Sequence, residues 1–162
     1  MGRVIAIANQ KGGVGKTTTA VNLSACMAAA HKKTLLIDLD PQGNATQGLG
    51  IDKNSVEGSV YDLLVNDKSV AEVALATEWD NLFIVPSNRE LVGAEVELID
   101  EEGREFRLKT RLAEALNDYD YIFIDCPPSL SILTLNGLVA ADGVLVTLQC
   151  EYYALEGLSE LL

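Results

Sequence analysis

The chain has 162 residues, of which 48% are hydrophobic and 22% charged; this balance is typical of one globular domain and excludes an intrinsically disordered protein. The net charge of −12 argues against a nucleic-acid binder, because basic side chains cluster only between Arg104 and Arg111. No apolar stretch reaches the length of about 18 residues that a membrane-spanning helix needs, and the N-terminus is too short for a signal peptide, so we expect a cytoplasmic protein.

Five short runs rich in Val, Ile, Leu and Phe predict β-strands at residues 4–8, 35–39, 82–85, 121–124 and 144–148. The runs are continuously apolar instead of alternating with polar residues, as expected for strands that are buried on both faces. Segments with helical spacing lie between them, for example at residues 18–30 and 107–116, and residues 50–80 predict short helices and loops. This alternation of strands and helices indicates a three-layer α/β/α sandwich with a mostly parallel sheet.

The end of the sequence has the pattern of an amphipathic helix that stops early. Apolar residues recur from Tyr153 to Leu162, and no Gly, Asn or basic residue follows them to end the helix. We therefore expect residues 1–162 to be the N-terminal part of a single domain whose C-terminal strands and helices are missing. The strand at residues 144–148 would then be an exposed edge of the sheet.

A glycine-rich segment joins the first predicted strand to the first predicted helix and has a deviant form of the phosphate-binding P-loop motif. Its residues, which we expect to bind ATP, are Lys11, Gly12, Gly13, Val14, Gly15, Lys16, Thr17 and Thr18. The glycines let the backbone turn tightly, and the N-terminus of the following helix carries a partial positive charge that favours phosphate. In such a loop Lys16 bridges the β- and γ-phosphates, and the Thr17 hydroxyl binds Mg²⁺.

Three carboxylates follow predicted strands, where ligands bind in open α/β sheets. Asp125 ends the run at residues 121–124, and Asp38 and Asp40 follow the run at residues 35–37. Asp125 can hold Mg²⁺ through a water molecule, whereas Asp38 or Asp40 can orient the water that attacks the γ-phosphate. Each aspartate taken alone could instead cap a turn or a helix.

Further segments have the order and spacing of one family. They are residues 38–44 (Asp-Leu-Asp-Pro-Gln-Gly-Asn), 86–91, 125–130 and 149–158, and Lys11 stands ahead of the loop glycines. With these motifs the chain resembles the ParA/Soj-type ATPases that partition chromosomes or plasmids, a deviant Walker A group that also includes MinD. The sequence Asp-Pro-Gln-Gly-Asn within this motif favours the partition ATPases over MinD.

The resemblance implies roles for individual residues. Lys11 would reach the ATP of a partner subunit and would act with Lys16 in catalysis, while Asp40 would position the hydrolytic water. Asp125 would be the Walker B carboxylate, and Asp38 would support the magnesium site together with Thr17.

The resemblance also implies partners and a cycle. ATP would bring two subunits together as a homodimer, and a centromere-binding ParB-type protein would stimulate hydrolysis, which resets the switch. Full-length members bind DNA nonspecifically and associate with the nucleoid, through basic residues that would lie beyond this sequence.

Two other hypotheses about function stay open. The chain could be a metabolic or metal-assembly ATPase of the same P-loop group, or a nucleotide-binding fragment that never hydrolyses ATP. ATPase activity that is indifferent to DNA would favour the first, and tight ATP binding without release of phosphate would favour the second.

Overall fold

The computed structural model describes residues 1–149, and the helix predicted from Tyr153 lies outside the described residues. The strands are β1 (Arg3–Ala8), β2 (Thr34–Asp38), β3 (Leu75–Ala76), β4 (Leu82–Val85), β5 (Tyr121–Asp125) and β6 (Gly143–Val146). The helices are α1 (Lys16–Ala29), α2 (Asn44–Gly48), α3 (Val60–Leu64), α4 (Val70–Val73), α5 (Leu91–Glu97), α6 (Arg107–Ala115) and α7 (Ile132–Ala140), with a 3₁₀ turn η1 (Arg104–Phe106).

The strands form one sheet in the order β3-β4-β2-β5-β1-β6. Every pairing is parallel except that of β3 with β4. The five predicted strands are all present, with β4 at the predicted residues and the ends of the others shifted by at most two residues. Strand β3 was not predicted, because its two residues are too few to give a pattern. As predicted, β6 lies at an edge of the described sheet.

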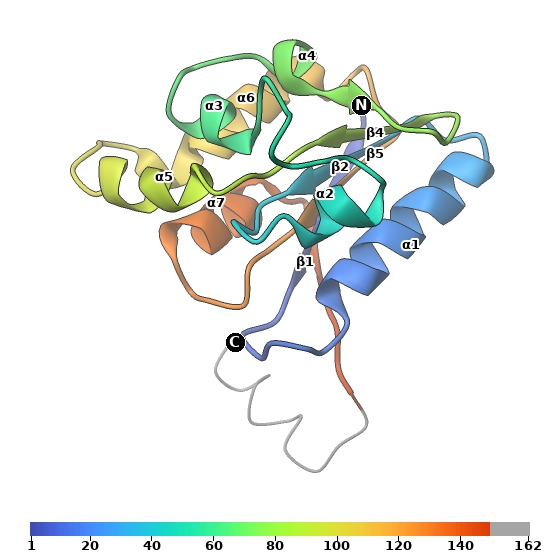
Figure 1. Ribbon diagram of the computed structural model, residues 1–162, viewed down its shortest axis with the longest axis horizontal. Helices are drawn as coiled ribbons and strands as arrows, with labels where there is room; N and C mark the ends of the chain where they lie inside the picture. The colour runs from blue at the N-terminus through green and yellow to red at the C-terminus, as the bar shows by residue number, and fades with distance from the viewer. Residues whose placement is uncertain (150–162) are drawn as a thin grey trace.

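Helices cover both faces of the sheet, which confirms the three-layer sandwich (Figure 1). Helices α1 and α2 pack on one face, and α3 to α7 lie on the other. Successive residues of a strand point to opposite faces, and in β5 Ile122 and Ile124 therefore enter one core whereas Phe123 enters the other. This geometry explains why the strands are continuously apolar in sequence.

Because β1, β2 and β5 are parallel, their carboxyl ends lie together at the same end of the sheet. In the register of β2 and β5, Asp38 pairs with Asp125, and in that of β1 and β5, Ile7 pairs with Asp125. The loop after β1, the loop after β2 and the segment after β5 are therefore neighbours. Within residues 1–149, no helix is both long enough and apolar enough to cross a membrane.

Candidate nucleotide-binding site

The loop between β1 and α1 has the backbone of a phosphate-binding loop. Gly13 and Gly15 have φ angles of 72° and 83°, in the left-handed region that residues with a side chain rarely adopt. Gly15 is also the N-cap residue of α1, and no side chain caps this end. The first amides of the 14-residue helix α1 thus remain available to an anion, and the helix dipole favours negative charge there.

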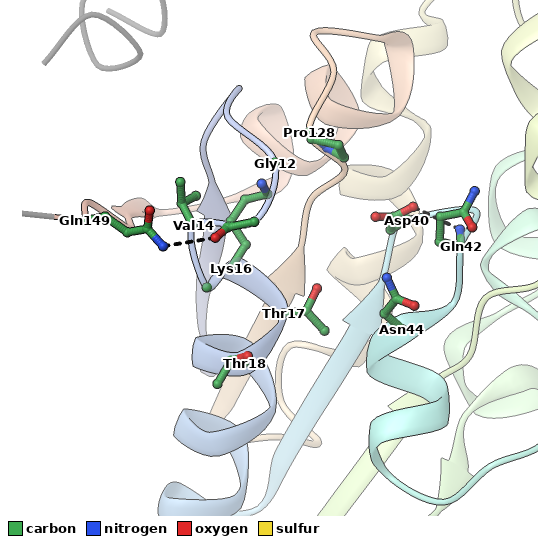
Figure 2. A pocket seen from close by; sticks show the side chains of 12 residues that line it. Gly12, Val14, Lys16, Thr17, Thr18, Asp40, Gln42, Asn44, Pro128 and Gln149 are labelled. Atoms are coloured by element: carbon green, nitrogen blue, oxygen red, sulfur yellow. Dashed lines mark hydrogen bonds between the residues drawn. The ribbon is translucent and has the colours of Figure 1, made fainter. Parts of the chain in front are cut away.

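A cavity of about 540 Å³ opens between this loop and the loop that follows β2 (Figure 2). Its lining residues are Gly12, Gly13, Val14, Gly15, Lys16, Thr17, Thr18, Asp40, Gln42, Asn44, Pro128 and Gln149. A Cβ atom added at Gly12, Gly13 or Gly15 would meet nothing within 4 Å. The loop therefore leaves open space at the positions where a phosphate group can approach the backbone closely.

Lys16 is the cation of the cavity. The residue is only 7% exposed, and its Nζ donates a 2.9 Å hydrogen bond to the carbonyl oxygen of Lys11. Burial lowers the pKa of Lys16, and the nearby carboxylates of Asp125 and Asp40 oppose this shift. The amine thus lies at the base of the loop, bound to a carbonyl that a phosphate oxygen can replace.

Thr17 and Asp125 meet beside the cavity. The Thr17 hydroxyl donates a 2.7 Å hydrogen bond to Oδ2 of Asp125, whereas Oδ1 of Asp125 is buried without a partner among the described residues. Burial raises the pKa of Asp125 to about 7. The hydrogen bond from Thr17 and the charge of Lys16 oppose this shift, whereas the negative charges of Asp38 and Asp40 increase it.

Asp38 is fully buried, and both of its carboxylate oxygens accept hydrogen bonds. Oδ2 accepts from the amide and the hydroxyl of Thr46, at 2.8 and 2.7 Å, and Oδ1 accepts from the amide of Asp40 at 3.2 Å. Burial raises the pKa of Asp38 to about 6, although these hydrogen bonds oppose the shift. Asp38 does not line the cavity, and its contacts are with the loop that carries Asp40.

Asp40 does line the cavity, on the side opposite Lys16 (Figure 2). Its Oδ1 accepts a 2.9 Å hydrogen bond from the amide of Gln42, which fixes the carboxylate at the start of a turn. Lys11 has an exposed side chain and is not among the lining residues. The residues predicted from the sequence thus fall into three groups. Most line the cavity, Asp38 and Asp125 form a buried pair at the strand ends, and Lys11 does not line the cavity.

Several site residues were not singled out from the sequence. Asn9 donates from Nδ2 to the carbonyl oxygen of Thr147 at 2.7 Å and accepts from the amide of Lys11 at 3.0 Å. Gln149 donates from Nε2 to the carbonyl oxygen of Gly13 at 3.0 Å. These bonds join the phosphate loop to the segment after β6. Four other residues that line the cavity could have been found from the sequence, because they fall within the motif segments quoted above: Gln42, Asn44, Pro128 and Gln149.

The donor set fits Mg²⁺ held jointly with a phosphate. Within residues 1–149, no group of three or more His, Cys, Asp or Glu side chains is placed to hold a metal ion. Mg²⁺ usually keeps several water ligands and takes one or two protein oxygens beside those of the substrate phosphates. The Thr17 hydroxyl and the unpartnered oxygen of Asp125 provide this kind of partial site.

Comparisons with known proteins agree with this geometry. The family described as "AAA domain" matches residues 2–162. Sporulation initiation inhibitor protein Soj of Bacillus subtilis (strain 168) is 59% identical over 162 residues, which are 100% of the chain and 64% of that protein. Chromosome partitioning protein ParA of Myxococcus xanthus (strain DK1622) is 58% identical over 161 residues, which are 99% of the chain and 57% of that protein.

One solved structure has the same fold as this chain and a similar sequence. It is the crystal structure of cobyrinic acid a,c-diamide synthase from Mycobacterium smegmatis with bound ATP analogue and magnesium, with a TM-score of 0.94 and 44% identity. The match covers 99% of this chain and 66% of that one. The chain thus spans 57% and 64% of the lengths of the two curated relatives. The chain belongs to the AAA domain family, and nearly its whole length is similar to the ParA and Soj partition proteins.

Proposed function

We propose that the chain binds ATP with Mg²⁺ in this cavity and hydrolyses it, as the nucleotide switch of a chromosome or plasmid partition system. The observation that carries the proposal is the placement of Lys16, Thr17 and Asp40 around one cavity whose loop backbone is open to phosphate. The similarity to ParA and Soj supports the partition role. Residues 1–162 would form the N-terminal part of a single P-loop ATPase domain.

Each residue has a task that follows from its position. The Lys16 amine would leave the Lys11 carbonyl and donate to β- and γ-phosphate oxygens, where its charge stabilises the transition state. Thr17 would turn its hydroxyl oxygen toward Mg²⁺, and Asp125 would hold a water ligand of the ion. Bound Mg²⁺ would supply neutralisation of the phosphate charge. Asp40 would orient the attacking water from the opposite side of the cavity.

The proposed switch includes a homodimer that forms with ATP, in which the exposed Lys11 reaches the ATP of the partner. A ParB-type centromere-binding protein would stimulate hydrolysis in the cytoplasm. DNA binding by these residues has less support, because the basic cluster on α6 is engaged: Arg107 and Arg111 both pair with Asp67. DNA contacts and association with the nucleoid would depend on the part of the relatives that this chain does not span.

The test is phosphate release with Mg-ATP, measured together with nucleotide affinity. We expect Lys16→Met to abolish turnover and to weaken nucleotide binding, and Asp40→Ala to abolish turnover while binding persists. Lys109→Met, which changes an exposed lysine on α6, is the matched control and should behave as the wild type. Turnover that survives in both Lys16→Met and Asp40→Ala would contradict the proposed site.

A second candidate is a metabolic or metal-assembly ATPase of the same group. Its support is the 44% identity and the TM-score of 0.94 to a protein named a synthase, which is weaker than the 58% and 59% identity to ParA and Soj that supports the partition role. The two candidates differ in what stimulates turnover: DNA and a ParB-type partner accelerate a partition switch, whereas a synthase is indifferent to both. A chain that binds ATP but releases no phosphate would instead be a non-hydrolysing nucleotide-binding fragment.

A further inference from the structure

Thr46, a residue outside the cavity, is the centre of a buried hydrogen-bond chain. Its side chain is fully buried in α2, and its hydroxyl and its amide both donate to Oδ2 of Asp38, at 2.7 and 2.8 Å. The same hydroxyl oxygen accepts a 3.0 Å hydrogen bond from the amide of Ser87. One side chain thus connects the end of β2, helix α2 and the segment after β4.

The chemistry of the partners fixes the direction of these bonds. A hydroxyl has one proton to donate, and the amide of Ser87 can only donate, so the Thr46 proton must point to Asp38. The Thr46 hydroxyl therefore has a single orientation, with one acceptor and one donor satisfied. Because all three groups are buried, loss of the hydroxyl would leave the Ser87 amide without its partner and remove one donor from Asp38.

The chain of bonds continues from Asp38 to the cavity. Oδ1 of Asp38 accepts from the amide of Asp40, and Oδ1 of Asp40 accepts from the amide of Gln42. The carbonyl oxygen of Asp40 accepts from the amide of Gly43 at 2.9 Å, which closes the turn. The backbone of the one aspartate that lines the cavity is thus held through Asp38 by Thr46.

We propose that Thr46 is a positioning residue for hydrolysis: it holds Asp38, and through Asp38 it sets the place of the Asp40 turn. This inference rests on the proposed function, in which Asp40 orients the attacking water. The phosphate loop lies on the other side of the cavity and makes no hydrogen bond to Thr46 among those described. Loss of the Thr46 hydroxyl should therefore impair the chemical step more than nucleotide binding.

Three variants separate the hydroxyl from the shape of the side chain. Thr46→Val removes the hydroxyl and keeps the branched shape, whereas Thr46→Ser keeps the hydroxyl and loses a methyl group. Thr34→Val is the matched control, since Thr34 is equally buried at the opposite end of β2 and donates to the carbonyl oxygen of Lys32 at 2.9 Å. All three are compared with the wild type at a temperature where each is folded.

The first measurement is steady-state phosphate release. We expect Thr46→Val to lower kcat about tenfold or more, because a small misplacement of a catalytic group is costly, while KM for ATP changes by less than about threefold. Thr46→Ser should recover most of kcat, and Thr34→Val should leave it unchanged. Equal kcat in Thr46→Val and the wild type, or an equal fall in Thr34→Val, would overturn the inference.

The second measurement needs no hydrolysis, so it separates failure of this inference from failure of the proposed function. Hydrogen exchange of the nucleotide-free chain reports on the amides of Asp40, Gln42 and Gly43, which form the turn. We expect exchange about tenfold faster in Thr46→Val, restored in Thr46→Ser, and unchanged in Thr34→Val. If the wild type releases no phosphate, this comparison alone decides: unchanged turn exchange in Thr46→Val overturns the positioning role.

Discussion

The hydroxyl of Thr17 donates a 2.7 Å hydrogen bond to Oδ2 of Asp125 and so joins the first turn of α1 to the end of β5. The bond connects residues that are 108 positions apart in sequence. It orients a carboxylate that is fully buried and whose other oxygen has no partner among the described residues. A buried polar atom without a partner is costly, which is consistent with an oxygen that is kept for a ligand.

We expect Asp125→Asn to remove the magnesium dependence of nucleotide binding. An amide in place of the carboxylate keeps the size of the side chain but cannot attract the hydrated cation with a negative charge. The affinity for ATP with Mg²⁺ should fall at least about tenfold, which corresponds to about 1.4 kcal/mol, while affinity in EDTA changes little. Titration with a fluorescent ATP analogue under both conditions measures this.

Asp118→Asn is the control for that titration, because it makes the same chemical change at an exposed aspartate. It should leave both affinities unchanged. If Asp125→Asn lowered affinity equally with Mg²⁺ and in EDTA, the carboxylate would act on the loop itself, and its role at the metal site would be wrong.

The raised pKa values of Asp38 and Asp125 predict how stability depends on pH. The values are about 6 and about 7 in the folded chain, against an ordinary value of 3.8, so the folded state binds more protons than the unfolded state between about pH 4 and pH 7. The contribution of these two groups to the free energy of unfolding is therefore highest near pH 4 and declines as the pH rises toward 7.

The difference between Asp125→Asn and the wild type isolates this effect from the other titrating groups. In urea unfolding without nucleotide, we expect the variant to gain stability relative to the wild type as the pH rises from about 4 to 8, by on the order of 4 kcal/mol, because Asp125 has its pKa raised from 3.8 to about 7. A difference that stayed constant over this pH range would show that Asp125 is not held in a raised-pKa state.

The sequence predicted the parts of the site that depend on residue type at fixed spacing. Continuous apolar runs located the strands, and the loop glycines with Lys16 and Thr17 located the cavity. Residue type and spacing alone could not separate Asp38 from Asp40, because Asp38 ends β2, Asp40 comes directly after Leu39, and either could orient water; only the family resemblance implied different roles for them. The structure separates them by position: Asp38 is buried and bonded to Thr46 of α2, whereas Asp40 lines the cavity. The contact between Thr46 and Asp38 arises only when α2 packs against the sheet, so spacing in the sequence cannot indicate it.

Gly12 and Gly13 should respond differently to alanine. A Cβ atom at Gly12 meets open space in a backbone conformation that alanine accepts, whereas Gly13 has a φ of 72°. We expect Gly12→Ala to leave stability within about 0.5 kcal/mol of the wild type, and Gly13→Ala to lose about 1 to 2 kcal/mol. Gly12→Ala should nevertheless weaken ATP binding at least about tenfold, since its methyl group occupies space for phosphate.

Thermal unfolding without nucleotide and ATP titration together check this pair. Retention of full ATP affinity by Gly12→Ala would mean that phosphate does not approach the backbone at this position. A loss of stability in Gly12→Ala as large as that in Gly13→Ala would show that the open space beside Gly12 is not available to a methyl group.

Asn9 should be necessary for the shape of the phosphate loop. Asn9 is 4% exposed, and its side-chain amide joins the Lys11 amide to the carbonyl oxygen of Thr147. Asn9→Ala removes both of these bonds, and their loss should lower the free energy of unfolding by about 1 to 3 kcal/mol. Because the lost bonds hold the loop that binds phosphate, the affinity for ATP should fall as well.

Asn9→Asp distinguishes the two consequences. The aspartate keeps an acceptor for the Lys11 amide but cannot donate to Thr147, and it adds negative charge close to the phosphate site. It should therefore weaken ATP binding more than Asn9→Ala does, with a larger effect at low salt, because screening reduces charge repulsion. Asn117→Ala, at an exposed asparagine, is the control for stability and affinity. Equal affinity in Asn9→Asp and Asn9→Ala at low salt would place the bound phosphates away from Asn9.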